Sequence, residues 1–281
     1  MTLIVQLTDL HVRPTGLASS RVVETTMLTE RALRAVARLQ PAPDAILLTG
    51  DLTECGLAEE YAVLAEMLAR LLAVPVHAIP GNHDRRERLL AGLPGTRQAD
   101  GFVQYTVEDL PVRLVMLDTV VPGAGHGELC QRRLDWLDAT LAAAAERPTL
   151  LAMHHPPFVT GIVHMDAIML QEPERLRAVL ERYTQVQRIV CGHHHRAITA
   201  RFAGAIASVC PSVAHQVELD LRSTAPAAFR LEPPAFQLHR WTLADGFVSH
   251  IAFVEDYPGP FPFLDHAGYP GGIDTKQPRS F

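Results

Sequence analysis

Short apolar runs alternate with stretches of helical periodicity through the first two thirds of the chain. Apolar runs of about four to eight residues are typical of buried strands, whereas apolar residues spaced three and four positions apart indicate the buried face of a helix. The pattern predicts strands over 2–7, 44–49, 74–79, 102–107, 112–117, 149–153 and 186–191, and helices over 23–39, 57–72, 129–145 and 173–183. Strands that alternate with helices predict parallel sheets joined by helical crossovers, and therefore an α/β fold.

Beyond residue 196 the pattern changes to short strands without helices between them. These strands are predicted over 198–202, 205–209, 235–243 and 247–254, and we expect them to form a second sheet. The earlier pair at 102–107 and 112–117 predicts a hairpin. From Pro258 onward the chain is rich in proline and glycine. We therefore divide the chain into a domain over 1–255 and a C-terminal tail over 256–281.

The composition narrows the class of protein. The chain has 281 residues, of which 48% are hydrophobic, as in globular proteins. Its formal net charge of -6 provides no overall basic field for a nucleic acid polymer. The four cysteines form no CxxC pair, no apolar run reaches the length of a membrane span, and no signal-peptide pattern precedes the first strand. We expect a cytoplasmic protein without membrane insertion.

Polar side chains follow five of the predicted strands, at the point where each strand ends. They belong to Asp9, His11, Asp51, Asn82, His154, His193 and His195. Sites in parallel sheets gather at the carboxyl ends of strands, so we expect these side chains to meet. Adjacent side chains on an extended chain point to opposite faces. We therefore select His154 rather than His155, and we expect His194 to turn away from its two neighbours.

These side chains offer oxygen and imidazole ligands and no thiolate. Such donors suit divalent Mn, Fe, Zn or Co and argue against a structural zinc finger. The carboxylate of Asp51 can bridge two cations about 3.5–4 Å apart, a spacing suited to in-line displacement at phosphorus. Two such cations neutralise phosphate oxygens and lower the pKa of a bound water, which makes hydroxide at neutral pH.

His83 follows the candidate ligand Asn82 and is placed to donate a proton or a hydrogen bond to the leaving-group oxygen. Asp84 comes next and can orient the His83 ring, so we assign both residues to catalysis. The arginine cluster over 85–88 indicates either the start of a solvated helix, which is favoured, or a contact to an anionic substrate. Asp118, at a strand end, is either a partner of the site or an ordinary strand-end residue, and His126 has no assigned role.

The motifs follow one another in a fixed order. They are Asp9-x-His11, Gly50-Asp51-x-x-Glu54, Gly81-Asn82-His83-Asp84, His154-x-Pro156 and Gly192-His193-x-His195. This set resembles the motifs of the calcineurin-like metallophosphoesterases, over about residues 2–255. Within that superfamily the chain is most similar to bacterial glycerophosphodiesterases and class III cyclic nucleotide phosphodiesterases, on the segments 57–61, 154–157, 165–166 and 213–217.

The resemblance implies a four-layer α/β/β/α sandwich with two mixed β-sheets. It implies one cation held by Asp9, His11, Asp51 and His195, and a second held by Asp51, Asn82, His154 and His193. It also makes His83 and His215 substrate contacts, although His215 taken alone indicates a structural residue. Glu54 stands where Asp or Asn is commoner in the family, at a position that is not a ligand. By analogy with this branch, we expect a homo-oligomer formed through the C-terminal region.

The function that we expect is hydrolysis of small-molecule phosphodiesters by a metal-dependent enzyme. Glycerophosphodiesters are the first substrate class, and 2′,3′- or 3′,5′-cyclic nucleotides are the second. A protein phosphatase and a DNA nuclease are disfavoured, because the sequence offers no long docking segment and no DNA-binding module. A non-catalytic, metal-dependent scaffold on the same fold is the remaining alternative.

Overall fold

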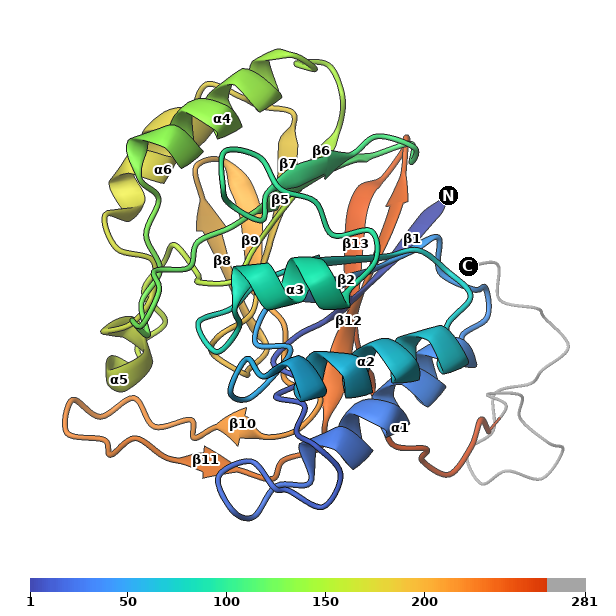
Figure 1. Cartoon of the computed structure of the whole chain (residues 1–281). Helices are drawn as coiled ribbons and strands as arrows, with labels where there is room; N and C mark the ends of the chain where they lie inside the picture. The colour runs from blue at the N-terminus through green and yellow to red at the C-terminus, as the bar shows by residue number, and fades with distance from the viewer. Residues whose placement is uncertain (262–281) are drawn as a thin grey trace, which may run out of the picture.

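Two mixed β-sheets lie face to face at the centre of the fold, and the computed structural model describes residues 1–261 (Figure 1). The first sheet has the strand order β13-β12-β1-β2-β3. Its strands are β1 (Thr2–Leu7), β2 (Ala45–Thr49), β3 (Val76–Ile79), β12 (Ala235–Thr242) and β13 (Gly246–Phe253). The three strands β1, β2 and β3 run parallel, as the sequence predicts for strands joined by helices.

The second sheet has the order β4-β5-β6-β7-β9-β8. Its strands are β4 (Tyr105–Val107), β5 (Arg113–Leu117), β6 (Thr149–Met153), β7 (Val186–Cys191), β8 (Ile198–Phe202) and β9 (Ala205–Val209). The strands β5, β6, β7 and β9 are parallel, whereas β4 and β8 pair antiparallel with their neighbours at the two edges. The hairpin predicted over 102–107 and 112–117 is therefore confirmed.

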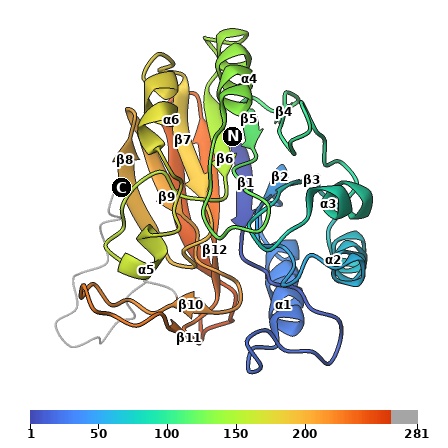
Figure 2. The same ribbon diagram turned by 60° about the vertical axis from the view of Figure 1, so that its left-hand side comes forward.

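Helices cover the outer face of each sheet and complete the four layers. The helices are α1 (Thr25–Ala37), α2 (Ala58–Leu71), α3 (Arg86–Gly92), α4 (Gln131–Ala142), α5 (Val163–Asp166) and α6 (Pro173–Leu180). Figure 2 shows α1, α2 and α3 on one side of the paired sheets, with α6 on the other. The helix α2 begins where the Glu60 carboxylate accepts the backbone N–H of Leu57, a capping contact that stabilises a helix N-terminus.

One part of the predicted topology is wrong. The strands β12 and β13 were expected to join the short strands β8 and β9, but β12 pairs antiparallel with β1 and extends the first sheet. β12 pairs with the edge of β1 that β2 leaves free, and the local sequence pattern does not indicate such a long-range pairing. A short pair, β10 (Gln216–Val217) with β11 (Phe229–Arg230), lies beside α5 at one end of the sandwich in both views.

Two apolar clusters form the core. One packs the first sheet against α1 and α2 and includes Ile46 and Leu64, and the other packs the second sheet against α4 and α6 and includes Leu137 and Leu176. Within the described residues, no helix is both long enough and apolar enough to cross a membrane. Residues 262–281, which make up most of the predicted tail, lie outside the described part of the chain.

Candidate metal centre

The polar side chains selected from the sequence come together between the two sheets. Asp9 and His11 follow β1, Asp51 follows β2, and Asn82 follows β3. Each of these strands belongs to the first sheet. The remaining residues, His154 after β6 and His193 with His195 after β7, come from the second sheet. The site therefore draws its side chains from the carboxyl ends of strands in both halves of the sandwich.

The backbone of these strand ends is held in an unusual conformation. Five of the candidate ligands have positive φ angles, namely Asp9 (52°), His11 (47°), Asp51 (49°), His193 (71°) and His195 (48°). A residue with a Cβ rarely adopts this left-handed region, and each case costs about 1–3 kcal/mol. Backbone hydrogen bonds between neighbouring loops hold this strained conformation in place: Asp9 N–H donates to Gly50 O, and His11 N–H donates to Asp51 O. The left-handed turns aim the side chains of neighbouring strand ends at a shared space.

Three histidine rings are each held through Nδ1. His154 Nδ1–H donates to the Thr49 carbonyl at 2.8 Å, and His195 Nδ1–H donates to the His215 carbonyl at 2.9 Å. His11 Nδ1 lies 2.9 Å from the Glu54 carboxylate. A carbonyl oxygen can only accept, so the proton of neutral His154 and His195 is on Nδ1 and the lone pair is on Nε2. For His11, the carboxylate beside Nδ1 favours the same placement of the proton.

The Nε2 lone pairs face other acceptors. His11 Nε2 and His195 Nε2 are 3.2 Å apart. His154 Nε2 lies 3.2 Å from Asn82 Oδ1 and 3.4 Å from Asp51 Oδ2. In the metal-free protein a proton on Nε2 of His11 and of His154 explains these contacts: burial opposes protonation, but the nearby carboxylates raise the pKa of each ring to about 9. A divalent cation can take the place of these protons, because imidazole with carboxylate is the donor set of borderline divalent metals. The residues present therefore fit divalent cations.

The geometry separates the candidate ligands into two groups. Asp9, His11, Asp51 and His195 place one ligand atom each within 4.8 Å of one another, and these are the four residues expected for one cation. His154 and His193 lie in another group with His155. Asp51 approaches both groups, as expected for a bridging carboxylate. His193 donates Nε2–H to the Ile168 carbonyl at 3.0 Å, which leaves Nδ1 available as a ligand.

The charges of the site influence one another strongly. Burial raises the pKa of Asp9 to about 7, and the nearby Asp51 carboxylate adds to the shift. Burial also opposes ionisation of Asp51, yet the attraction of the His154 and His83 rings holds its pKa well below the ordinary value. Burial acts to lower the pKa of His11, but the Glu54 and Asp51 carboxylates overcome it and raise that pKa to about 9. Without a cation, protons thus balance the carboxylates of the site.

His83 lies at the edge of the centre and faces a pocket of about 470 Å³. Its Nδ1–H donates to the Glu54 carbonyl at 2.7 Å, and its backbone N–H donates to Asp51 Oδ1 at 2.9 Å. His215 lines the same pocket, and its ring stacks edge-on against Phe229 of β11 with centroids 5.0 Å apart. The side chains of Met165 and Val217 form an apolar part of the pocket lining.

The expected role of Asp84 is wrong. The buried Asp84 carboxylate accepts hydrogen bonds from the backbone N–H groups of Leu52 and Gly81 and from the Tyr61 hydroxyl, at 2.8–3.1 Å. These hydrogen bonds do not reach the His83 ring, which the Glu54 carbonyl orients instead. Asp84 joins the Asp51 loop to the Asn82 loop, so its role is to position ligands rather than to orient the acid.

The two neighbouring histidines also differ from expectation. His155 was expected to point away, but its ring lies 4.6 Å from that of His193, centroid to centroid. It is not available as a ligand, because Nδ1 accepts from Thr119 Oγ1 at 2.7 Å and Nε2–H donates to the Gly125 carbonyl. His194 belongs to neither group of candidate ligands, in keeping with the expected turn away from its neighbours, but it is fully buried, with Nε2 3.7 Å from Asp166, rather than facing solvent. At His194 the extended-strand rule does not apply, because His193 and His195 on either side of it have positive φ angles.

The arginine cluster proves to be partly structural. Arg86 forms a two-pronged ion pair with the buried Asp118, with Nε–Oδ2 and Nη2–Oδ1 distances of 2.6 and 2.9 Å. Asp118 also accepts the backbone N–H of Val103. The helix start that was favoured for this cluster is confirmed by α3, whereas the ion pair with Asp118 was not anticipated. Arg86 and Asp118 do not line the metal pocket.

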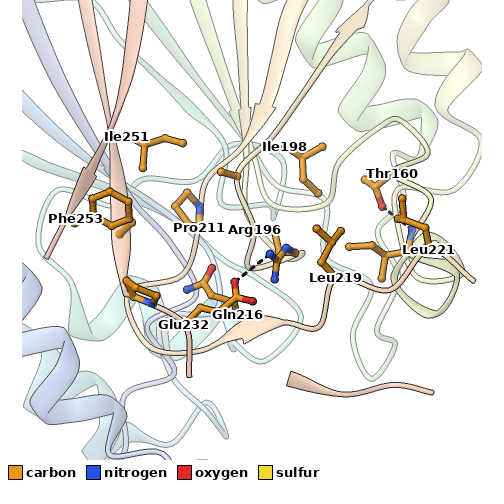
Figure 3. Close-up of a pocket in the computed structure, with 14 residues that line it drawn as sticks. Thr160, Arg196, Ile198, Pro211, Gln216, Leu219, Leu221, Glu232, Ile251 and Phe253 are labelled. Atoms are coloured by element: carbon orange, nitrogen blue, oxygen red, sulfur yellow. Dashed lines mark hydrogen bonds and ion pairs between the residues drawn. The ribbon is translucent and has the colours of Figure 1, made fainter. Parts of the chain in front are cut away.

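A second pocket of about 400 Å³ lies beyond the metal pocket, between the loop at Thr160 and the strands β12 and β13 (Figure 3). Its lining is mostly aliphatic, and Ile198, Leu221 and Ile251 point into it. Arg196 extends across one side, where it pairs with Glu232 at 3.0 Å and donates to the Val217 carbonyl. These two contacts connect the segment after His195 to the chain around β10 and β11.

The chain is similar in sequence to known phosphoesterases, a class that fits the site described above. The family model described as calcineurin-like phosphoesterase matches residues 2–197. The chain is 36% identical to a probable glycerophosphodiester phosphodiesterase GpdQ of Arcobacter nitrofigilis, over 95% of this chain and 98% of that protein. It is 37% identical to a probable cyclic nucleotide phosphodiesterase of Rhodopseudomonas palustris, over 90% of this chain and 93% of the relative.

Solved structures agree with the four-layer fold. A dimetal phosphatase from Danio rerio superposes with a TM-score of 0.61, at 17% identity, over 90% of this chain and 99% of that one. At this identity the likeness concerns the fold alone. The ordered motifs, the matching family model and the full-length relatives identify the chain as a member of the calcineurin-like phosphoesterases.

Proposed function

We propose that the protein hydrolyses small phosphodiesters at a centre of two divalent cations, with glycerophosphodiesters as the first substrate class. The observation that carries the proposal is the convergence of acceptor atoms: the Nε2 lone pairs of His11, His154 and His195 face carboxylate, amide and imidazole acceptors. When bound, the cations would neutralise phosphate oxygens and activate a water as nucleophile. Mn, Fe, Zn and Co remain the proposed identities.

We assign the ligands of each cation as the family resemblance implies. Asp9, His11, Asp51 and His195 would hold one cation, and Asp51, Asn82, His154 and His193 the other. His83 would hydrogen-bond the leaving-group oxygen and donate a proton to it. Its Nδ1–H is committed to the Glu54 carbonyl, so only Nε2 can carry out this transfer.

The pocket supports a small substrate rather than a macromolecular one. Its volume of about 470 Å³ lies in the range typical of small-molecule sites. His215, whose ring lies 5.6 Å from that of His11, would contact the phosphate or its ester oxygen. The apolar side chains of Met165, Ile168 and Phe229 would bound the space left for the alcohol groups.

Cyclic nucleotides are the second candidate substrate class. The supporting observation is the similarity to several proteins named as cyclic nucleotide phosphodiesterases, including the relative from Rhodopseudomonas palustris. A cytoplasmic location, a homo-oligomer and a domain ending at residue 255 also stay predictions from the sequence.

One experiment tests the proposed function. The protein is stripped with a chelator, Mn²⁺ is restored, and hydrolysis of bis(p-nitrophenyl) phosphate is compared with that of p-nitrophenyl phosphate. We expect turnover that depends on the metal and favours the diester, after which a glycerophosphodiester and 3′,5′-cyclic AMP are compared by kcat/KM. Preference for the monoester would indicate a phosphatase instead. Absence of turnover with two metals bound would favour the non-catalytic scaffold.

A further inference from the structure

We propose that Glu54 is a positioning residue that holds the cation ligand His11 and the acid His83 at the same time, through different atoms. Its carboxylate contacts His11 and its backbone carbonyl contacts His83. The inference rests on the proposed function for its catalytic consequence, although its structural part concerns metal binding alone. The sequence assigned no role to Glu54 and showed only that it stands where Asp or Asn is commoner in the family.

The carboxylate contact determines how His11 can bind a cation. Glu54 Oε2 lies 2.9 Å from His11 Nδ1, and the His11 side chain is only 5% exposed. On the other side of the ring, Nε2 faces His195 Nε2 at 3.2 Å. A carboxylate on one imidazole nitrogen keeps the proton there, orients the ring and makes the other nitrogen a better ligand. Glu54 thus presents the Nε2 lone pair of His11 to the centre.

The backbone contact determines how His83 can donate its proton. The Glu54 carbonyl accepts Nδ1–H of His83 at 2.7 Å, so the second ring nitrogen is the one free to act. The rings of His11 and His83 meet edge to face, with centroids 4.7 Å apart and planes at 83°. Glu54 therefore sets the positions of two adjacent rings relative to each other.

The backbone of Glu54 is anchored without its own side chain. Its N–H donates to the Val12 carbonyl at 3.2 Å. The buried Glu60 carboxylate accepts the N–H groups of Cys55 and Leu57, both at 3.0 Å, and thereby closes the turn that follows. Because these contacts do not use the Glu54 carboxylate, shortening that side chain should leave the carbonyl on His83 in place. The two functions of Glu54 can be separated by substitution.

The test uses Glu54→Ala, Glu54→Gln and, as a matched control, Glu59→Ala, which removes an exposed glutamate from the first turn of α2. Each full-length protein is stripped with a chelator and titrated with Mn²⁺ by calorimetry. We expect Glu54→Ala to weaken one of the two binding events about 10–100-fold, as for other partners of metal-bound histidines. Glu54→Gln should recover part of the loss, because its amide oxygen still accepts Nδ1–H. Glu59→Ala should bind Mn²⁺ as the unmodified protein does.

Activity separates this inference from the proposed function. At saturating Mn²⁺, we expect Glu59→Ala to turn over the diester as the unmodified protein does, so any loss of kcat in Glu54→Ala is assigned to the Glu54 side chain. Unchanged Mn²⁺ affinity in Glu54→Ala, or an equal loss in Glu59→Ala, would overturn the positioning role. If Glu54→Ala does not fold, the affinity of Glu54→Gln decides: a value below that of the unmodified protein supports the role, and an equal value rejects it. An unmodified protein that binds Mn²⁺ without turnover would instead reject the proposed function.

Discussion

The Nε2 atoms of His11 and His195 face each other at 3.2 Å, although the other nitrogen of each ring is already paired with an oxygen. Two lone pairs at this distance repel unless a proton or a cation lies between them. The Asp51 carboxylate lies 3.8 Å from His11 Nε2, and the Asp9 carboxylate lies 3.4 Å from His195 Nε2. With its pKa raised to about 9, His11 is protonated in the metal-free protein, and the proton on its Nε2 lies between the two rings. A cation held by these residues would take the place of that proton.

Replacement of His83 by Ala should lower turnover while metal content is unchanged. His83 is not among the proposed ligands, and general acid catalysis contributes about 10²–10⁴-fold to rate. The loss should be larger for a diester with an alkyl alcohol as leaving group than for bis(p-nitrophenyl) phosphate, because p-nitrophenolate leaves without protonation. Steady-state kinetics on both diesters, with metal analysis of each preparation, make the comparison. Equal losses on the two diesters would show that His83 does not protonate the leaving group.

Replacement of Gly81 by Ala should disrupt the metal centre. A Cβ at this position would lie 2.2 Å from Asp51 Oδ1 and 2.3 Å from the Asp51 backbone nitrogen, so the bridging residue must move. We expect fewer than two Mn²⁺ ions per chain at concentrations that saturate the unmodified protein. The control is Gly125→Ala, where the added Cβ meets only Ile168 at 3.7 Å. Full metal content in Gly81→Ala would contradict the assignment of Asp51 as a shared ligand.

Replacement of Arg86 by Ala should destabilise the fold by about 3–5 kcal/mol, because it leaves the buried Asp118 carboxylate without its main partner. The matched control is Arg31→Ala, which breaks an exposed pair with Glu255 and should cost about 0–1 kcal/mol. Urea unfolding gives both free energies. A similar small effect of the two substitutions would mean that Arg133, 4.0 Å from Asp118, compensates for the loss.

His239 should make the stability of the metal-free protein depend on pH. Burial, aided by the charge of Arg188, lowers the pKa of His239 to about 3, below the ordinary value near 6.5. The unfolded chain therefore binds this proton at a higher pH than the folded protein. Stability from this residue is fully present above about pH 6.5 and falls as the pH decreases toward 3, by at most about 1.4 kcal/mol per pH unit.

The variant His239→Gln isolates that contribution. Gln can keep hydrogen bonds with Ser249 and Gln6, which the two ring nitrogens contact at 2.8 and 3.2 Å, but it does not titrate. Urea unfolding with chelator at several pH values between 4.5 and 7 should give a shallower decrease for the variant. Parallel decreases for the two proteins would assign the acid sensitivity to other buried histidines.

The sequence predicted the residues of the site better than their surroundings. Strand ends are local features, so Asp51 and His154 were identified from the apolar runs before them. The pairing of β12 with the edge of β1 could not be predicted from the sequence. The two strands are separated by more than two hundred residues, and many other pairings satisfy the same alternation of apolar and polar positions. The buried place of His194 lies between two residues with positive φ angles, His193 and His195, which leave no mark in the residue pattern.

Hydrogen bonds to main-chain groups could not be predicted from the sequence either. His83 was recognised as an acid, yet its orientation comes from a carbonyl group that every residue type possesses at that position. The role of Asp84 was misjudged for the same reason, since its partners are backbone N–H groups of two separate loops. Side-chain identity predicts chemistry, whereas such contacts become visible only once the loops are placed.

The division of the candidate ligands between the two sheets has a mechanical consequence. Asp9, His11, Asp51 and Asn82 belong to one half of the sandwich, and His154, His193 and His195 belong to the other. A cation held by both groups cross-links the halves and resists their separation. Release of Mn²⁺ during unfolding should then coincide with separation of the two sheets, so the amount of free Mn²⁺ reports how many molecules have separated sheets.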